Sequence, residues 1–171
     1  MDGALEAKVV AYKGQRMAVI RLYGAIGPPN GFQASQFVDS LSRLGDYDVL
    51  YAILDSSGGS AIDAWIIHDF LNKNRTPRQG SLVLVTNECS GSAILIALAF
   101  KQILMRSGSY IRFQPIELSR PIATRRASQV LARLTSQRIK CRVEDVLGWM
   151  DKNKKFSAEE CLKLSLCDAI V

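Results

Sequence analysis

Two successive glycines, Gly58 and Gly59, lie in the stretch Asp55-Ser56-Ser57-Gly58-Gly59-Ser60, after an apolar run and before a helical pattern. Glycine leaves backbone amides accessible to a ligand, and two successive amides at the start of a helix can bind an oxyanion. The turn is therefore a candidate for stabilising the negative charge that forms during acyl transfer. The same residues also describe a plain tight turn from a strand into a helix, which is the commoner meaning of such a pattern.

Serine side chains follow a second apolar run, in the stretch Cys89-Ser90-Gly91-Ser92-Ala93. A serine nucleophile requires a base within hydrogen-bonding distance, and a carboxylate usually orients that base. Ser90 and Ser92 lie between a predicted strand and an apolar helix, and ligands in parallel α/β folds bind at such carboxyl ends of strands. Both serines also suit the N-cap of that helix, which is the more common role.

No residue is identified by its position as the base. His68 is the single histidine, and a helix at ~1.5 Å per residue places it about 13–15 Å from the Gly58 turn, so we expect it at the surface or in an interface. Lys101 and the run Lys152-Asn153-Lys154-Lys155 offer amines. A catalytic lysine must be desolvated, whereas this run is typical of a solvated segment.

Composition argues against several classes of protein. The chain has 171 residues, 48% hydrophobic and 22% charged, as in ordinary globular proteins. Four cysteines without a CxxC pair and one histidine do not make a zinc set, so we expect no metal and no cofactor. We expect free thiols in a reducing compartment, no secretory leader, and no membrane span, because the longest apolar run, residues 93–100, is too short. The prediction is a cytoplasmic protein.

Apolar runs and helical spacing alternate along the chain. Strands are predicted at residues 17–23, 49–54, 81–86, 102–105, 109–113 and 168–171. Helices are predicted at 37–44, 62–70, 93–100, 123–138 and 143–150, with a last helix capped by Ser157 and Glu160. Residues 93–100 are apolar on every side, which predicts a helix buried in the protein or between subunits. The alternation indicates a mostly parallel α/β sheet, with ligand sites at the carboxyl ends of its strands.

The order and spacing of these motifs resemble the ClpP family of peptidases over roughly residues 19–171. In that family a strand leads into Asn-Ser-Pro-Gly-Gly-Ser and a helix ending near Ile-Tyr-Asp. Here Asp55 to Ser60 and Ile66-Ile67-His68-Asp69 keep that spacing without a gap. Further along, Cys89 to Ala93 is similar to the family's Cys-x-Gly-x-Ala, and Phe113-Gln114-Pro115 is similar to its His-Gln-Pro. Near the end, Phe156-Ser157-Ala158-Glu159-Glu160 is similar to Met-Ser-Ala-Glu-Glu, and Leu164 to Ile170 is similar to Gly-Leu-Val-Asp-x-Ile. Signal peptide peptidases, with Ser-Gly-Gly-Tyr near Ser90, and crotonases are similar more loosely.

The resemblance implies one α/β domain over residues 1–171, with the repeated ββα spiral of ClpP and crotonases and a mostly parallel sheet flanked by helices. Residues 114–150 would then form a shortened version of the family's helical handle. The relatives' fold also implies a homo-oligomer, with an active paralogue or an unfoldase as further partners and a peptide or protein as ligand.

The family's catalytic triad is not intact at the matching positions. Its histidine falls on Phe113, which cannot accept a proton, and its aspartate falls on Asn153, which stabilises an imidazolium poorly. Its serine falls on Leu95 when the register is carried forward from Cys89. The segment between the nucleophile and position 113 is shorter here than in the family, so a deletion before the helix would instead bring Ser92 or Ser90 to the nucleophile position.

We therefore expect a ClpP-like subunit with a serine-peptidase fold that is catalytically silent or impaired and acts through oligomeric assembly or peptide binding. One alternative is an active serine hydrolase with a rearranged Ser/Lys-type site at Ser92 or Ser90. Another is a crotonase-like acyl-CoA enzyme that uses the Gly58 and Gly59 amides as its oxyanion hole, although no Glu or Asp pair is evident in the matching loops.

Basic residues concentrate in one segment of a chain whose net charge is +6; they are Arg120, Arg125, Arg126, Arg133, Arg138, Lys140 and Arg142. No aromatic residues alternate with them to stack on bases. We therefore expect a solvated face, or one that meets an acidic partner, and not a nucleic-acid interface.

Overall fold

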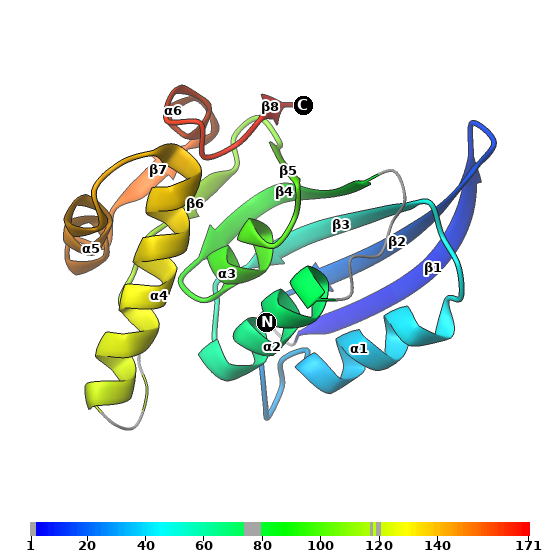
Figure 1. Cartoon of the computed structure of the whole chain (residues 1–171), viewed down its shortest axis with the longest axis horizontal. Coiled ribbons are helices and arrows are strands. Elements are labelled where there is room, and N and C mark those ends of the chain that lie inside the picture. The colour runs from blue at the N-terminus through cyan, green and yellow to red at the C-terminus, as the bar shows by residue number, and fades with distance from the viewer. Residues whose placement is uncertain (1–2, 74–79, 117, 119–120) are drawn as a thin grey trace.

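The computed structural model describes residues 3–73, 80–116, 118 and 121–171. These residues form a mixed α/β architecture, in which one eight-stranded sheet is flanked by helices (Figure 1). The main path of the sheet runs, in this order, through β1 (Ala4–Tyr12), β2 (Gln15–Tyr23), β3 (Val49–Ser56), β4 (Gly80–Ser90), β5 (Gln102–Met105) and β8 (Ala169–Ile170). The strand β6 (Tyr110–Arg112) leaves this path to pair with the end of β4 and with β7 (Lys155–Ser157). Of the described pairs, β1–β2 and β6–β7 are antiparallel and the others are parallel, as the alternating pattern predicts.

Helices lie in two groups around this sheet (Figure 1). The first group, along one face, consists of α1 (Ala34–Arg43), α2 (Ala61–Lys73) and α3 (Ala93–Leu98). The second group gathers beside β6 and β7 and consists of α4 (Pro121–Ile139), α5 (Val143–Asp151) and α6 (Ala158–Lys163). The carboxyl ends of β3 and β4 point into the space where the two groups approach each other, and both candidate motifs follow those ends.

The core follows from the alternation of side chains along the strands. In β2 from Ala18 onward and in β3, every second residue is fully buried, including Ile20, Leu22, Leu50 and Leu54. The residues between them are only partly buried, because they lie on the face that the first helix group does not cover. The sheet is therefore packed on one face and partly open on the other.

Each predicted strand and helix is present, with ends that differ by a few residues. The sequence prediction missed two strands, β1 and β7. The strand β1 pairs with β2 through a two-residue turn, in which Lys13 and Gly14 both have positive φ angles of 49° and 78°. Such turns normally carry Asn-Gly or Asp-Gly, so Lys13-Gly14 gives a weak hairpin signal. The strand β7 has only three residues and depends on its pairing with β6.

The apolar helix α3 is buried by its own chain. Residues 93–97 and Phe100 have almost no surface exposed once the single chain is folded. The first of the two predicted environments, burial in the protein, is therefore the one found. Because the apolar surface of α3 is already buried within the chain, this helix gives no support for self-association.

The last helix begins with the predicted capping box. Ser157 accepts a hydrogen bond from the Glu160 amide at 3.3 Å, and the Ser157 amide donates to the Glu160 carboxylate at 2.8 Å. The four cysteines are free thiols, three of them buried. Burial raises the pKa of the Cys161 thiol to about 12 and also raises that of Cys89. Within the described residues, no helix is long and apolar enough to cross a membrane.

Candidate active site

The glycine turn after β3 has a backbone that requires glycine. Gly58 and Gly59 have φ angles of +96° and +141°, which L side chains rarely adopt. A Cβ atom on Gly58 would lie 2.7 Å from the Ser90 carbonyl oxygen, at the end of β4. The two candidate motifs are therefore in direct backbone contact, as their shared position at the carboxyl end of the sheet predicts.

The two amides of the turn are not equivalent. The Gly58 amide donates a hydrogen bond to the Ser56 hydroxyl oxygen at 3.1 Å. Within the described part of the chain, the Gly59 amide has no acceptor, and Gly59 lines a cavity. Among the described residues, the Gly59 amide is therefore not engaged by the protein, whereas the Gly58 amide would first have to leave Ser56.

Of the two candidate nucleophiles, Ser92 lies at the turn. Its hydroxyl donates a hydrogen bond to the Gly59 carbonyl oxygen at 3.0 Å, and its side chain is nearly buried. Ser92 occupies the N-cap position of α3, but its side chain caps no amide of that helix. Ser90 is fully buried, and its hydroxyl donates to the Glu88 carboxylate at 2.6 Å.

A cavity of about 470 Å³ opens beside Ser92; its lining consists of Gly59, Gly91, Ser92, Gln114, Pro115, Ile116 and Asn153. This arrangement brings together three residues singled out from the sequence, Gly59, Ser92 and Asn153. Asn153 has a left-handed backbone, with φ of +49°, in the turn after α5, a conformation that asparagine tolerates better than most residues. None of the described lining residues has a side chain that titrates near neutral pH.

Leu95, the other residue assigned to the nucleophile position, lies away from this cavity. It is 2% exposed in the first turn of α3, within the apolar core. Its carbonyl oxygen accepts a hydrogen bond from His68 Nδ1 at 2.8 Å.

Phe113 also belongs to the core. It is fully buried, and its ring meets Trp149 and Phe156 edge to face, with centroids 5.5 and 5.9 Å away. Its amide donates to the Lys154 carbonyl oxygen at 2.9 Å, which holds the strand beside the turn that carries Asn153.

His68 was expected at the surface or in an interface. The structure shows that it is not at the surface. It is buried because its imidazole lies between the α3 backbone and Trp65, whose ring stacks on it with centroids 5.3 Å apart. Burial beside an apolar helix was not apparent from its position in the α2 pattern.

The sequence prediction gave no role to Gln114, which lines the cavity. Its side-chain amide donates to the Ser57 carbonyl oxygen at 3.2 Å and packs on Gly91, where a Cβ atom would lie 2.9 Å from Nε2. Gln114 therefore ties the two motifs together from the β6 side. The signal was its place directly after Phe113, in the segment that resembles His-Gln-Pro.

Two solved structures are similar to this chain. It matches a mutant of ClpP1 from Listeria monocytogenes with a TM-score of 0.70 and 17% sequence identity, over 90% of each chain. It also matches a mutant of 1510-N, a membrane-bound stomatin-specific protease, with a TM-score of 0.67 and 15% identity, over 88% of this chain and 77% of that one. No protein-family model and no curated protein matches the sequence.

The fold is ClpP-like. This confirms the resemblance found in the sequence motifs and the predicted fold class, a mixed α/β sheet flanked by helices. The protein therefore has a peptidase fold. At 15–17% sequence identity, the similarity shows the fold alone. It does not assign roles to Ser92, Asn153 and Gly59. The looser similarity to signal peptide peptidases stays a prediction.

Proposed function

We propose that this chain is a ClpP-like subunit that binds peptide at the Gly58-Gly59 turn and has little or no hydrolytic activity. The observation that carries the proposal is the chemistry of the cavity beside Ser92. A serine attacks a carbonyl only when a base removes its proton. The Ser92 proton is instead donated to the Gly59 carbonyl oxygen, and the described lining residues offer no base.

The groups left in the cavity suit recognition of a peptide backbone. The Gly59 amide is a free donor among the described residues, and the carboxamides of Gln114 and Asn153 each carry donors and acceptors. A volume of about 470 Å³ lies in the range of sites that enclose a ligand. Peptide carbonyls and amides would therefore be bound by neutral hydrogen bonds, without a step that changes covalent bonds.

A serine-reactive fluorophosphonate probe tests this proposal. We expect intact-mass measurements to show no stoichiometric labelling of Ser92 or Ser90, and peptide and ester substrates to be turned over no faster by the wild type than by Ser92→Ala. The Ser92→Ala chain is the matched control for nonspecific reaction at other nucleophiles. Stoichiometric labelling that disappears in Ser92→Ala would overturn the proposal.

That same outcome would support the second candidate, an active serine hydrolase with Ser92 as nucleophile and a lysine as base. The observation in its favour is that Ser92 lines a cavity and lies 3.0 Å from the turn that the family uses as its oxyanion hole. A crotonase-like acyl-CoA enzyme finds less support, because the described lining residues include no glutamate or aspartate pair.

We further propose that the chain acts in an assembly, with copies of itself or with an active paralogue, and that an unfoldase is a candidate partner. Support comes from the open face of the sheet, where a mainly apolar groove of about 410 Å³ lies among residues such as Tyr51, Leu82, Leu84 and Leu104. We also propose that residues 1–171 act as one domain, that 114–150 form a shortened handle, and that the protein works in the cytoplasm.

A further inference from the structure

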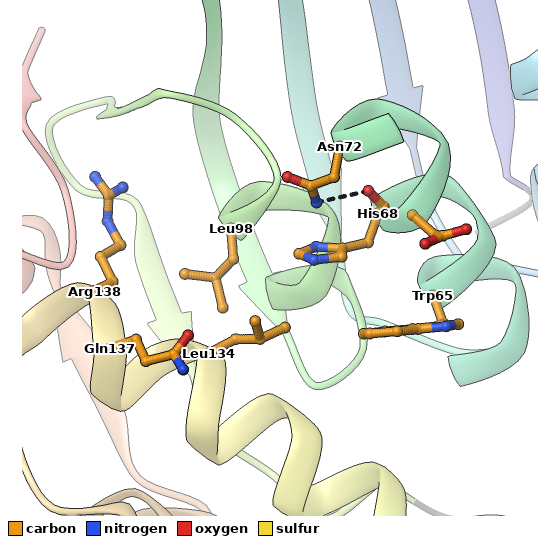
Figure 2. A pocket seen from close by; sticks show the side chains of 8 residues that line it. Trp65, His68, Asn72, Leu98, Leu134, Gln137 and Arg138 are labelled. Atoms are coloured by element: carbon orange, nitrogen blue, oxygen red, sulfur yellow. Dashed lines mark hydrogen bonds between the residues drawn. The ribbon is translucent and has the colours of Figure 1, made fainter. Parts of the chain in front are cut away.

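A second groove lies between α2 and α4, and it shares no lining residue with the cavity at Ser92 (Figure 2). Trp65, His68, Asp69 and Asn72 of α2 line one side, and the Asp69 carboxylate is paired with Lys73 at 2.7 Å. Gln137 and Arg138 of α4 line the other. Leu98 and Leu134 lie between the two walls, as Figure 2 shows. The volume of about 670 Å³ is large enough to receive more than one side chain of a partner.

The walls of this groove are held in place by interactions of their own. His68 donates through Nδ1 to the Leu95 carbonyl oxygen, and Asn72 donates to the His68 carbonyl oxygen at 2.9 Å. Across the groove, Arg138 donates to the Leu166 carbonyl oxygen at 3.1 Å and pairs with Asp168 at 2.6 Å. A partner would therefore bind to ordered side chains and lose little conformational entropy on their account.

An apolar ridge continues the groove onto the outer side of α2. Ile62, Trp65 and Ile66 are 65%, 43% and 45% exposed. Single exposed apolar residues are ordinary, but three at helical spacing beside a concave site are typical of an interaction surface.

The other border of the groove is basic. Arg126 and Arg133 are exposed and seven residues apart, so they lie along one side of α4, and the exposed Lys140 follows directly after the helix ends at Ile139. Arg133 lies one turn before Gln137, which lines the groove. None of the three basic side chains forms an ion pair with the described residues, and the sequence of α4 contains no acidic residue.

We propose that the α2–α4 groove docks an amphipathic helix of a partner protein, whose apolar stripe enters the groove and whose acidic flank faces α4. The apolar floor and ridge require large apolar side chains at helical spacing, which is how helices bind in grooves. The unpaired arginines and lysine select acidic residues beside that stripe. A lipid surface is flat and would not enter a concave site with polar walls, and RNA would not bury the isoleucines of the ridge.

Binding of a synthetic helical peptide to the full chain tests this proposal. The probe is a fluorescein-labelled peptide with leucine on one face and glutamate on both flanks, and the control peptide carries lysine in place of glutamate. Fluorescence anisotropy should show saturable binding of the glutamate peptide, at least tenfold tighter than that of the lysine peptide, and weaker at higher salt. Equal binding of the two peptides, or none of either, would overturn the proposal.

Matched variants locate the binding. We expect Ile66→Ser and Arg133→Glu each to weaken binding of the glutamate peptide at least tenfold. Leu162→Ser on α6 and Arg43→Glu on α1 change equivalent exposed residues elsewhere and should leave the affinity within about twofold. Circular dichroism checks that all four variants are folded. Equal losses in the groove and control variants would refute the assignment.

Three further outcomes would also refute it in favour of another occupant. One is binding of the wild type to vesicles of anionic phospholipid that Ile66→Ser abolishes. Another is binding of the wild type to a single-stranded RNA that Ile66→Ser abolishes. The last is self-association, measured by sedimentation, that Ile66→Ser abolishes and that the glutamate peptide does not inhibit.

Discussion

At position 113 the side chain belongs to the core, where it stabilises the protein instead of serving as a base. The Phe113 ring fills the space between Trp149 and Phe156, so the β6–β7 pair is joined to α5 by aromatic contacts. An imidazole in its place would lose part of these contacts and bring a polar group into an apolar cluster. Restoring the family's histidine there would therefore weaken the fold, in addition to any effect on chemistry.

The glycine turn gives a prediction at the scale of a single residue. Gly58→Ala should lower the free energy of unfolding by at least about 2 kcal/mol, because the backbone strain costs about 1–3 kcal/mol and the new Cβ atom collides with the Ser90 carbonyl oxygen. Gly45→Ala is the control, since Gly45 also has a positive φ, +67°, but open space around it. It should cost about 1 kcal/mol. Urea denaturation of both variants measures the difference, and equal losses would show that the contact with Ser90 is unimportant.

The candidate site could be predicted from the sequence only in part. Gly58, Gly59 and Ser92 follow neighbouring strands, and the carboxyl ends of parallel strands meet, so their approach was predictable. Asn153 was identified as a site residue from the order of the motifs that resemble those of the ClpP family. The hydrogen-bond partners were not predictable, because Ser56 and a ligand compete for the same Gly58 amide and only the folded backbone decides between them. Burial of His68 likewise depends on the position of α3, which the α2 sequence does not encode.

At the scale of secondary structure, apolar patterns and turn signals predicted every described element except β1 and β7. The buried strands β3 and β4 and the helices α1, α2, α4 and α5 have clear apolar patterns and turn signals at their ends. The strand β1 does alternate apolar Leu5, Ala7 and Val9 with polar residues, but its turn residues are unusual. The strand β7 has three residues, too few for any period to emerge, and its partner strand determines it.

The capping box of α6 gives a prediction at this scale. Ser157→Ala removes the acceptor of the Glu160 amide and should lower the free energy of unfolding by about 1 kcal/mol. Ser42→Ala, in the last turn of α1, removes an exposed hydroxyl with no capping role and should change stability by no more than about 0.5 kcal/mol. Thermal unfolding followed by circular dichroism compares the two. A cost for Ser157→Ala no larger than that of Ser42→Ala would contradict the assigned role of the cap.

At the scale of the molecule, the open face of the sheet gives the test of self-assembly. Sedimentation velocity should show concentration-dependent association of the wild type. Leu82→Asp places a charge in the apolar groove of that face and should raise the dissociation constant at least tenfold. Leu162→Asp, a charge at an exposed apolar residue of α6, serves as the control and should leave association unchanged. A monomer at all concentrations would exclude assembly of this chain with itself.

The burial of α3 within one chain has a consequence for the dependence of folding on concentration. A subunit whose most apolar helix is covered by a neighbour unfolds when it is diluted, because mass action removes the cover. Here residues 93–97 are covered by the chain's own sheet and helices. Dilution that dissociates an assembly of this chain should therefore leave a folded monomer, whose unfolding midpoint no longer changes on further dilution.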